Sequence, residues 1–327
     1  MEKKRKKINY LIESALILFI ILFVGFLFWN AMRIDKIEEA DGNTGKEPSQ
    51  SEIDIIEYAG KKYSYNHNLT NILFIGTDKE KITGHPEVPG EAGQADVLFL
   101  VSLNKETKEA VIYQIPRETM TEIDVYDNNG NRNGSKHMQI AYQYAYSIGG
   151  ESGCWAMQKT VSELLHDVNI DGYIAMDMAA IPTLNDAIGG VTLTIPEDYT
   201  MLDPVLVKDS LVTLNGKQAQ DYIRYMDEDQ TFSNQQRMER QLQFITAWMN
   251  GMKNIEEEEY ENMHPILEQH VITTMSEDEI KELIQYDYVD SETKFIPGEW
   301  MSGDEADEYR VGEELKRMVM EDFYIQK

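Results

Sequence analysis

One segment near the N-terminus restricts how this 327-residue chain can fold. Five consecutive basic residues, Lys3 to Lys7, precede an apolar stretch that extends from Tyr10 to Met32. A helix rises ~1.5 Å per residue and a bilayer core is ~30 Å thick, so this stretch is long enough to span a membrane. Glu13 lies near the basic end, within reach of the headgroups, and Trp29 lies at the other interface. We therefore predict a transmembrane helix over residues 10–32.

The basic cluster also predicts the orientation of the chain. Basic residues flanking a transmembrane helix stay on the cytoplasmic side. Residues 1–9 then form a cytoplasmic tail, and everything beyond residue 32 lies outside the cytoplasm, in a single-pass protein of the cell membrane. A cleaved signal peptide is the alternative, but residues 29–33, Trp-Asn-Ala-Met-Arg, contain no small-residue cleavage site. The sequence favours the uncleaved anchor.

Charge and cysteine content exclude several classes of protein. The chain has 30 basic and 58 acidic residues and a net charge of −28. Nucleic-acid binding needs basic patches, so we expect no nucleic-acid partner. Cys154 is the one cysteine, so no intrachain disulfide forms and the fold depends on a hydrophobic core. The adjacent Trp155 on a predicted helix favours a packing role for Cys154 over a nucleophilic one.

Residues 33–65 are acidic and polar and read as an extracytoplasmic linker, and residues 66–327 as one large domain. Short apolar runs predict strands over 72–75, 97–103, 110–115, 173–178, 191–195 and 294–296. The connection 104–108 is short enough for a hairpin. Helical patterns cover 140–147, 154–166, 181–188, 237–252, 255–270, 277–286 and 311–323. Strands interspersed with helices imply an α/β domain with a mixed central sheet flanked by helices.

Three charged residues stand at the ends of predicted strands, where α/β sheets place their sites. Asp78 leaves the first strand, Asp96 enters the second, and Arg117 follows the third. Two carboxylates close in space can hold a divalent cation, and a neighbouring arginine can bind a phosphate. Each residue alone is also consistent with an ordinary turn or strand-end charge.

A second basic group comes later in the chain. Arg224 precedes an acidic segment, and Arg237 and Arg240 lie three residues apart near the start of a predicted helix. Residues at this spacing share one face of a helix. Cations near a helix N-terminus oppose its dipole, so the pair predicts an anionic ligand. Surface salt bridges to the nearby acidic residues are the alternative.

Several short strings occur along the chain in a set order: Asn71-Ile72-Leu73-Phe74-Ile75-Gly76-Thr77-Asp78, Ala95-Asp96, Ile115-Pro116-Arg117-Glu118-Thr119, Ala141-Tyr142 with Gly149-Gly150, Asp186-Ala187-Ile188-Gly189-Gly190-Val191, Asn215-Gly216-Lys217-Gln218-Ala219, Tyr222-Ile223-Arg224, and Arg237 to Gln241. In this order the chain resembles the LytR-CpsA-Psr family, membrane-anchored enzymes that attach glycan polymers to bacterial cell walls. The resemblance covers about Asn71 to Gln243. No single string is specific, but their order together with the N-terminal anchor is.

The resemblance implies a phosphotransferase that takes a glycan from a polyprenyl-pyrophosphate carrier and passes the glycan-1-phosphate to a peptidoglycan hydroxyl. By the same resemblance, Asp78 and Asp96 hold Mg²⁺, and Asp96 is also catalytic. The lipid lies in an apolar tunnel between sheet and helices. The implied catalytic and substrate-binding residues are Arg117, Arg224, Asp229, Arg237, Arg240 and Gln241. Phosphoryl transfer depends mainly on positioning and charge neutralisation, which suits such a set.

The chain departs from the family pattern at several positions. Met226 stands where a second arginine is usual, Gln94 replaces a common arginine, and Glu118 replaces an aspartate. Loss of a cation that stabilises a transition state can cost ~10²-fold in rate. A receptor or regulator that binds a lipid-linked or wall glycan is therefore an alternative to the transferase. Hydrolysis of the same lipid pyrophosphate is a third hypothesis, which differs only in the acceptor.

Overall fold

The computed structural model describes residues 55–79, 81–82, 88–91, 93–227, 233–253, 255, 257–303 and 306–327. These residues belong to one unit, Ile55–Lys327. The transmembrane helix predicted for residues 10–32 lies outside the described residues and stays a prediction. Within the described ranges, no helix combines the length and apolarity needed to cross a membrane.

A six-stranded sheet forms the centre of this unit, in the order β11-β8-β3-β4-β5-β12. β3, β4 and β5 pair antiparallel, with the predicted hairpin between β4 and β5, whereas β8 runs parallel to β3 and β12 parallel to β5. The predicted mixed α/β sheet is therefore confirmed. The strands are β3 (Leu69–Thr77), β4 (Ala95–Asn104), β5 (Glu109–Gln114), β8 (Gly172–Asp177), β11 (Val271–Thr273) and β12 (Asp287–Phe295).

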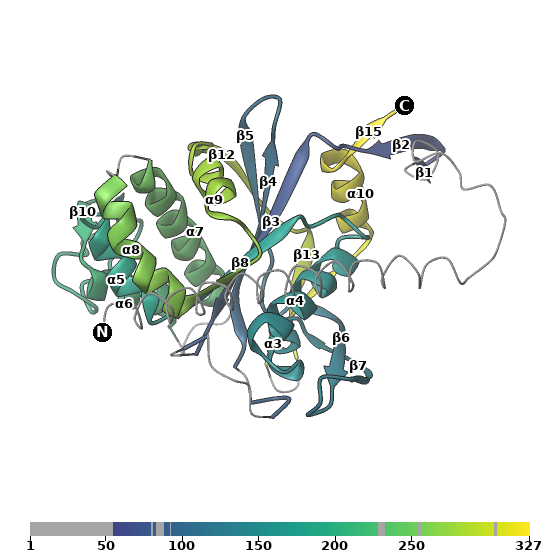
Figure 1. Cartoon of the computed structure of the whole chain (residues 1–327), viewed down its shortest axis with the longest axis horizontal. Helices are drawn as coiled ribbons and strands as arrows, with labels where there is room; N and C mark the ends of the chain where they lie inside the picture. Colours follow the sequence, from purple (N-terminus) through teal and green to yellow (C-terminus); the bar gives the residue numbers. More distant parts are fainter. Residues whose placement is uncertain are drawn as a thin grey trace, which may run out of the picture. The chain divides into compact units, whose positions relative to one another are not determined.

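Helices cover both faces of the sheet. Side chains alternate between the faces of a strand, and β3 is apolar on both. Leu73 and Ile75 belong to the cluster that contains Val161 of α4, while Ile72 packs in the cluster that contains Met249 of α7. Figure 1 shows the two layers on either side of β3–β5. The first layer holds α3 (Tyr142–Tyr146), α4 (Gly150–Leu164) and α10 (Glu313–Asp322), and the second holds α7 (Ser233–Met252) and α9 (Glu277–Ile284).

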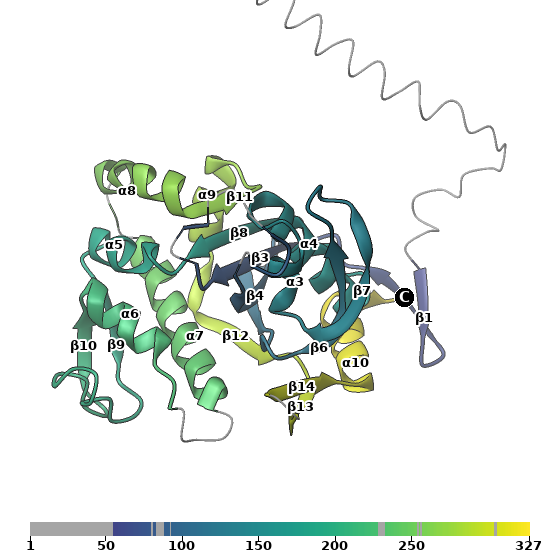
Figure 2. The ribbon, with the colours of Figure 1, turned by 90° about the horizontal axis from the view of Figure 1, so that it is seen from below.

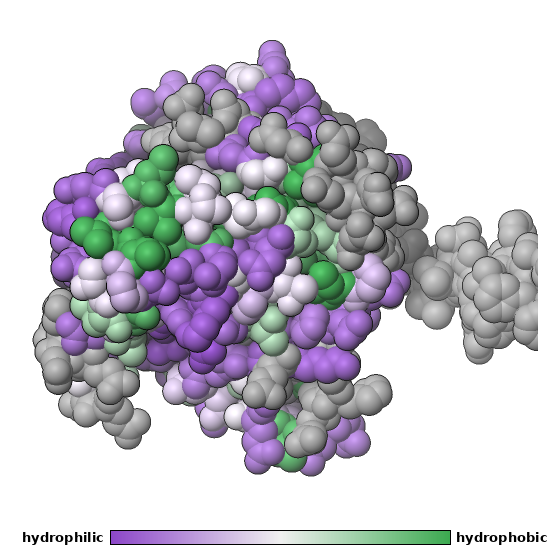
Figure 3. Space-filling model, turned by 90° about the vertical axis from the view of Figure 1, so that its left-hand side faces the viewer, coloured by the Kyte–Doolittle hydropathy of each residue, from purple (hydrophilic) through white to green (hydrophobic). Residues whose placement is uncertain are grey.

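A smaller group of elements packs around α7. They enclose a third apolar cluster, to which Tyr222 and Phe244 belong. α6 begins at a capping box formed by Asn215 and Gln218. Figure 2 shows these elements together in the ribbon, and the space-filling view of this side in Figure 3 shows apolar residues on the surface among hydrophilic ones. The elements are α5 (Ala180–Ala187), β9 (Val191–Thr194), β10 (Leu211–Leu214), α6 (Gly216–Arg224) and α8 (Glu257–His270).

Three antiparallel hairpins differ from the expectation. Residues 55–65, assigned above to the linker, form β1 and β2, and β2 pairs with β15 at the other end of the chain. Local composition cannot show a pairing with a distant strand. The helix expected from residue 311 begins at Glu313, because β14 occupies the preceding residues. The strands are β1 (Ile55–Tyr58), β2 (Lys61–Tyr65), β15 (Tyr324–Gln326), β6 (Met120–Tyr126), β7 (Arg132–Gln139), β13 (Gly298–Ser302) and β14 (Asp307–Val311).

Candidate functional site

Strand pairing brings the first three predicted residues to one end of the sheet. Asp78 follows β3, and its N–H donates to Gln94 O at 3.1 Å. Thr77 pairs with Ala95 and Gly76 with Val97, so Asp96 is an extra, bulged residue in β4. A bulge redirects a side chain at a strand end. Arg117 follows β5 and reaches Asp96, with which it forms an ion pair.

Arg117 lies between two carboxylates. Its Nη1 donates to Asp96 Oδ1, and its Nε donates to Glu118 Oε1 at 2.9 Å. Burial opposes its charge, but the attraction of Asp96 and Glu118 outweighs this effect, so the pKa of Arg117 is raised. The two carboxylates therefore hold the guanidinium charged and in one orientation.

Arg237 extends from the first turns of α7 toward the same place. Its side chain is buried, with 7% of the residue exposed, and its Nε and Nη2 have no hydrogen-bond partner among the described residues. Burial and repulsion by Arg117 lower the pKa of Arg237. A guanidinium nevertheless stays protonated in proteins. A buried cation with unused donors is costly, and an anionic ligand would satisfy it.

Arg240 and Gln241 have different surroundings. Arg240 is 2% exposed and donates to Tyr222 O at 2.9 Å, to Tyr199 Oη at 3.1 Å and to Tyr225 O. Gln241 Nε2 donates to Ile223 O at 3.2 Å. The last carbonyls of a helix have no partner within that helix. Both side chains thus stabilise the C-terminal end of α6, and their contact with substrate stays a prediction.

Arg224 and Met226 lie at the C-terminal end of α6. Arg224 is the last residue of that helix; it is exposed, and its guanidinium pairs with none of the described residues. Met226, where the family has a second arginine, is half-buried. It does not line either apolar cavity in the described part of the chain. Asp229 lies outside the described residues.

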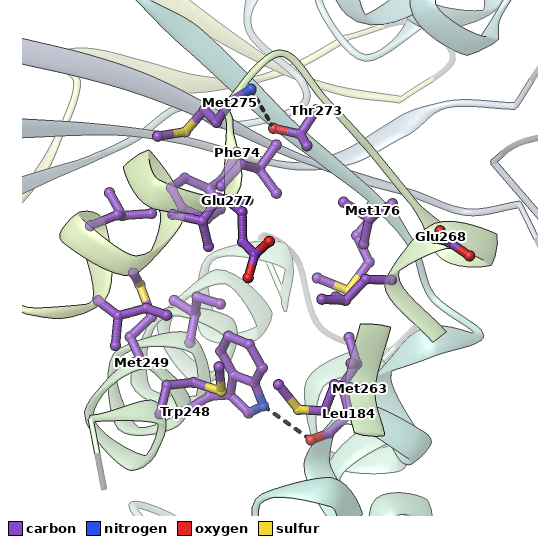
Figure 4. A pocket seen from close by; sticks show the side chains of 18 residues that line it. Phe74, Met176, Leu184, Trp248, Met249, Met263, Glu268, Thr273, Met275 and Glu277 are labelled. Atoms are coloured by element: carbon purple, nitrogen blue, oxygen red, sulfur yellow. Dashed lines mark hydrogen bonds between the residues drawn. The ribbon is translucent and has the colours of Figure 1, made fainter. Parts of the chain in front are cut away.

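Two apolar cavities extend between the sheet and α7. The larger, of about 290 Å³, is bounded by the sheet and by α7, α8 and α9, and the smaller is about 80 Å³. Phe74, Ile174, Met176 and Ile245 line both, so the cavities adjoin. Figure 4 shows methionine and tryptophan side chains around the larger one, with Trp248 Nε1 donating to Leu184 O. Such flexible side chains suit an irregular hydrocarbon ligand.

The smaller cavity leads toward the charged residues. Val97 and Gln241 belong to its lining. Val97 is next to Asp96 in the chain, and Gln241 is one helical turn from Arg237. The lining of the smaller cavity therefore includes chain neighbours of both Asp96 and Arg237.

Comparison with known proteins agrees with this arrangement. The sequence profile of the LytR_cpsA_psr family matches residues 30–309. The chain belongs to the LytR-CpsA-Psr family. It is 28% identical over 309 residues to the polyisoprenyl-teichoic acid–peptidoglycan teichoic acid transferase TagU of Bacillus licheniformis, with 92% of this chain and 88% of that protein covered.

The chain is also similar to a second curated protein and to a solved structure. It is 27% identical over 189 residues to biofilm regulatory protein A of Streptococcus mutans, with 55% of this chain and 44% of that protein covered. The crystal structure of B. subtilis TagU superposes with a TM-score of 0.57 at 23% identity, over 78% of this chain and 95% of that one. The latter likeness shows a shared fold.

Asp78 and Asp96 of this LytR-CpsA-Psr domain offer carboxylate oxygens, which are ligands that Mg²⁺ prefers. One oxygen of Asp78 accepts from Gln94 N–H at 2.8 Å, and one oxygen of Asp96 accepts from Arg117. The second oxygen of each has no hydrogen bond within the described residues. In the part of the chain that the structure describes, no group of three or more Asp, Glu, His or Cys side chains that could hold a metal ion is assembled. Mg²⁺ commonly takes one or two carboxylates together with waters and substrate phosphates.

Sequence reasoning missed two polar contacts at this site. Glu118 Oε2 accepts from Asn234 Nδ2 at 2.7 Å. Asp177, fully buried beside the smaller cavity, accepts from Ala180 N–H and lies 2.9 Å from His270 Nδ1. The partners are 116 and 93 residues apart, so no local pattern signals either contact.

Proposed function

We propose that this chain is a membrane-anchored phosphotransferase that moves a glycan-1-phosphate from a polyprenyl-pyrophosphate carrier to a peptidoglycan hydroxyl. The TagU relative is named for a transfer of this kind, from a polyisoprenyl carrier to peptidoglycan. The observation that carries the proposal is the buried guanidinium of Arg237, with unused donors, on the helix α7 that also lines the apolar cavities. A lipid pyrophosphate has the matching chemistry, because two anionic phosphates adjoin a hydrocarbon chain.

Arg237, Arg117 and Arg224 would each offer different hydrogen-bond donors to the pyrophosphate. Arg237 offers Nε and Nη2, which have no other described partner. Arg117 is oriented by Asp96 and Glu118 and keeps Nη2 for a ligand. Arg224 adds a third, exposed cation at the end of α6. Phosphoryl transfer needs such positioning and charge neutralisation more than covalent help from the protein. Asp229, which lies between Arg224 and Arg237 in the sequence, is the proposed acid.

We further propose that Asp78 and Asp96 hold Mg²⁺ through the carboxylate oxygens that Gln94 and Arg117 leave unused. When bound, Mg²⁺ neutralises developing charge on the transferred phosphate. The helix predicted over residues 10–32 would keep the domain at the extracytoplasmic surface of the cell membrane, in which a polyprenyl carrier is embedded. External protease on protoplasts should then remove the domain, and resistance until lysis would contradict this orientation.

The function is tested with the full-length chain in detergent, a polyprenyl-pyrophosphate glycan, Mg²⁺ and peptidoglycan oligomers. We expect Arg237→Gln to lower transfer ~10²-fold or more, by analogy with loss of a transition-state donor. Arg317→Gln is the matched control, because Arg317 is an exposed cation on α10. Asp96→Ala should abolish Mg²⁺-dependent transfer. Unchanged transfer in Arg237→Gln, or unchanged Mg²⁺ dependence in Asp96→Ala, would rule out these assignments.

A receptor or regulator is the second candidate function. Met226 favours it, because the pyrophosphate site lacks the arginine that the family pattern has there. One relative is named a biofilm regulatory protein. A receptor would bind the lipid-linked glycan with Arg237-dependent affinity and yield no transfer product at any protein concentration. Release of glycan-1-phosphate without an acceptor would instead identify a hydrolase.

A further inference from the structure

A separate cavity of about 300 Å³ lies beside Asp78, on the side of α3. Its described lining shares no residue with the two apolar cavities. The side chains that surround it are mostly polar, from Asp78, Lys79, Glu91, Gln94 and Tyr142. The molecule therefore has an apolar space and a polar space at the same end of its sheet.

Several polar groups of this cavity are available to a ligand. Within the described residues, the side-chain amide of Gln94 and the hydroxyl of Tyr142 have no hydrogen-bond partner, while Oδ2 of Asp78 is the oxygen proposed above for Mg²⁺. The hydroxyl and the amide can each donate and accept. Lys79, in contrast, donates to Glu91 O at 2.6 Å. The cavity thus offers uncharged donors and acceptors next to the carboxylates of Asp78 and Glu91.

The loop beside Asp78 requires a glycine. Gly93 has a φ of +88°, and a Cβ at this position would lie 2.6 Å from Asp78 Oδ1. Any other residue would be strained and would displace the carboxylate. This close approach keeps Asp78 directed along the wall that the polar cavity shares with the candidate metal site.

We propose that this polar cavity binds the saccharide that accepts the transferred group; the inference rests on the proposed transferase function. In phosphoryl transfer the attacking and leaving oxygens lie roughly in line on opposite sides of phosphorus. The acceptor hydroxyl forms the new bond to the phosphorus attached to the glycan. The bond to the bridging oxygen breaks, polyprenyl phosphate leaves with the electron pair, and the hydroxyl proton passes to water.

In this proposal, the apolar cavities bind the leaving group and the polar cavity binds the attacking acceptor. The leaving polyprenyl phosphate belongs with the apolar cavities against α7. The acceptor must then approach from the other side of the charged residues, where Asp78 opens into the polar cavity. Its volume is at the lower end of the ~300–1,000 Å³ usual for small-molecule sites, which suits a short saccharide unit.

Tyr142 is the residue expected to recognise the sugar. It is half-buried, and its ring packs edge-on to Tyr146 with centroids 6.3 Å apart, which limits its motion. A tyrosine offers an apolar face for the C–H face of a pyranose and a hydroxyl for its polar edge. Asp78 and Glu91 in the wall disfavour a polyanionic ligand.

The test uses the full-length chain in detergent and peptidoglycan oligomers released by a muramidase, with Kd measured by calorimetry. Tyr142→Ala should weaken oligomer binding ~10-fold, because packing and a hydrogen bond are lost together. Tyr142→Phe keeps the ring and should lose less, about 2- to 5-fold. Trp155→Ala is the matched control, since Trp155 is an exposed aromatic on α4, outside the cavity.

Binding of the polyprenyl-pyrophosphate glycan, measured on the same variants, separates this inference from the proposed function. Tyr142→Ala should bind the lipid donor within twofold of the original chain while transfer falls. Equal oligomer affinity in Tyr142→Ala and the original chain would overturn the inference, as would an equal loss of donor and oligomer binding. Tyr142-dependent oligomer binding without any transfer product would support the saccharide site and overturn the transferase.

Discussion

Glu118 Oε2 accepts a 2.7 Å hydrogen bond from Asn234 Nδ2, and this contact joins the end of β5 to the first turn of α7. The other oxygen of Glu118 accepts from Arg117 Nε at 2.9 Å. Asn234 precedes Arg237 by one helical turn. One buried carboxylate therefore connects the segments that carry two of the three arginines of the proposed pyrophosphate site, Arg117 and Arg237.

Removal of this connection should affect both activity and stability. Glu118→Ala leaves Arg117 with one carboxylate partner and Asn234 with an unsatisfied amide. We expect a loss of ~1–3 kcal/mol in the free energy of unfolding and a clear fall in kcat. Denaturant unfolding and transfer assays measure these effects. Glu122→Ala is the control, because Glu122 is exposed and contacts only His137 among the described partners; an equal effect there would contradict the role of Glu118.

Arg237 should stabilise the complex with the ligand but lower the free energy of unfolding of the ligand-free protein. Replacement of this buried cation by Met removes unused donors and a desolvated charge. We expect Arg237→Met to raise the free energy of unfolding by about 1 kcal/mol while transfer is abolished. Thermal unfolding without ligand, compared with the activity assay, tests both effects. Lower stability in Arg237→Met would show that the guanidinium is already well satisfied.

Substitution of Met226 should distinguish the transferase hypothesis from the receptor hypothesis. A guanidinium at this half-buried position, two residues after Arg224, restores the arginine of the family pattern. If the chain is a transferase, Met226→Arg should maintain or increase turnover, and Arg117→Ala should nearly eliminate it. If it is a receptor, both variants should change ligand affinity without any product. Met226 lines neither apolar cavity in the described structure. We therefore expect Met226→Arg to change the binding of the prenyl chain by these cavities little.

Ile245 is one of the four residues that line both apolar cavities, so its side chain lies where they adjoin. Ile245→Trp should fill this junction and weaken binding of a long polyprenyl donor. A donor with a short prenyl chain needs less of the larger cavity and should be affected less. KM values for the two donors measure the difference. An equal effect on both donors would indicate that the lipid does not pass the junction.

Cys154 should be inert at neutral pH. It is fully buried in the core, as the sequence predicted, and burial raises the pKa of its thiol to about 12 from an ordinary value near 9. A raised pKa in the folded state contributes stability that is complete below pH ~9 and is lost as pH rises toward 12. A thiol reagent at pH 8 should therefore modify the unfolded chain quickly and the folded chain slowly. Rapid labelling of the folded protein would contradict this burial.

The sequence alone determined the elements that local patterns encode. The apolar runs 72–75, 97–103 and 110–115 predict the strands at the centre of the sheet, because burial on both faces requires continuous apolar residues. The same patterns place Asp78, Asp96 and Arg117 at strand ends. β7 escaped prediction because its residues, Arg132–Gln139, are polar and mostly exposed, so no alternation marks the strand.

Only the tertiary structure decided what each charged residue contacts. Arg237 and Arg240 are three residues apart and look equivalent in the sequence. Arg240 donates to the C-terminal carbonyls of α6, whereas Arg237 lies within the electrostatic influence of Arg117, Asp96 and Glu118. The pairing of Glu118 with Asn234 likewise spans 116 residues. Hydrogen bonds and Coulomb forces act over a few ångströms in space, and chain folding sets those distances between residues that the sequence keeps far apart.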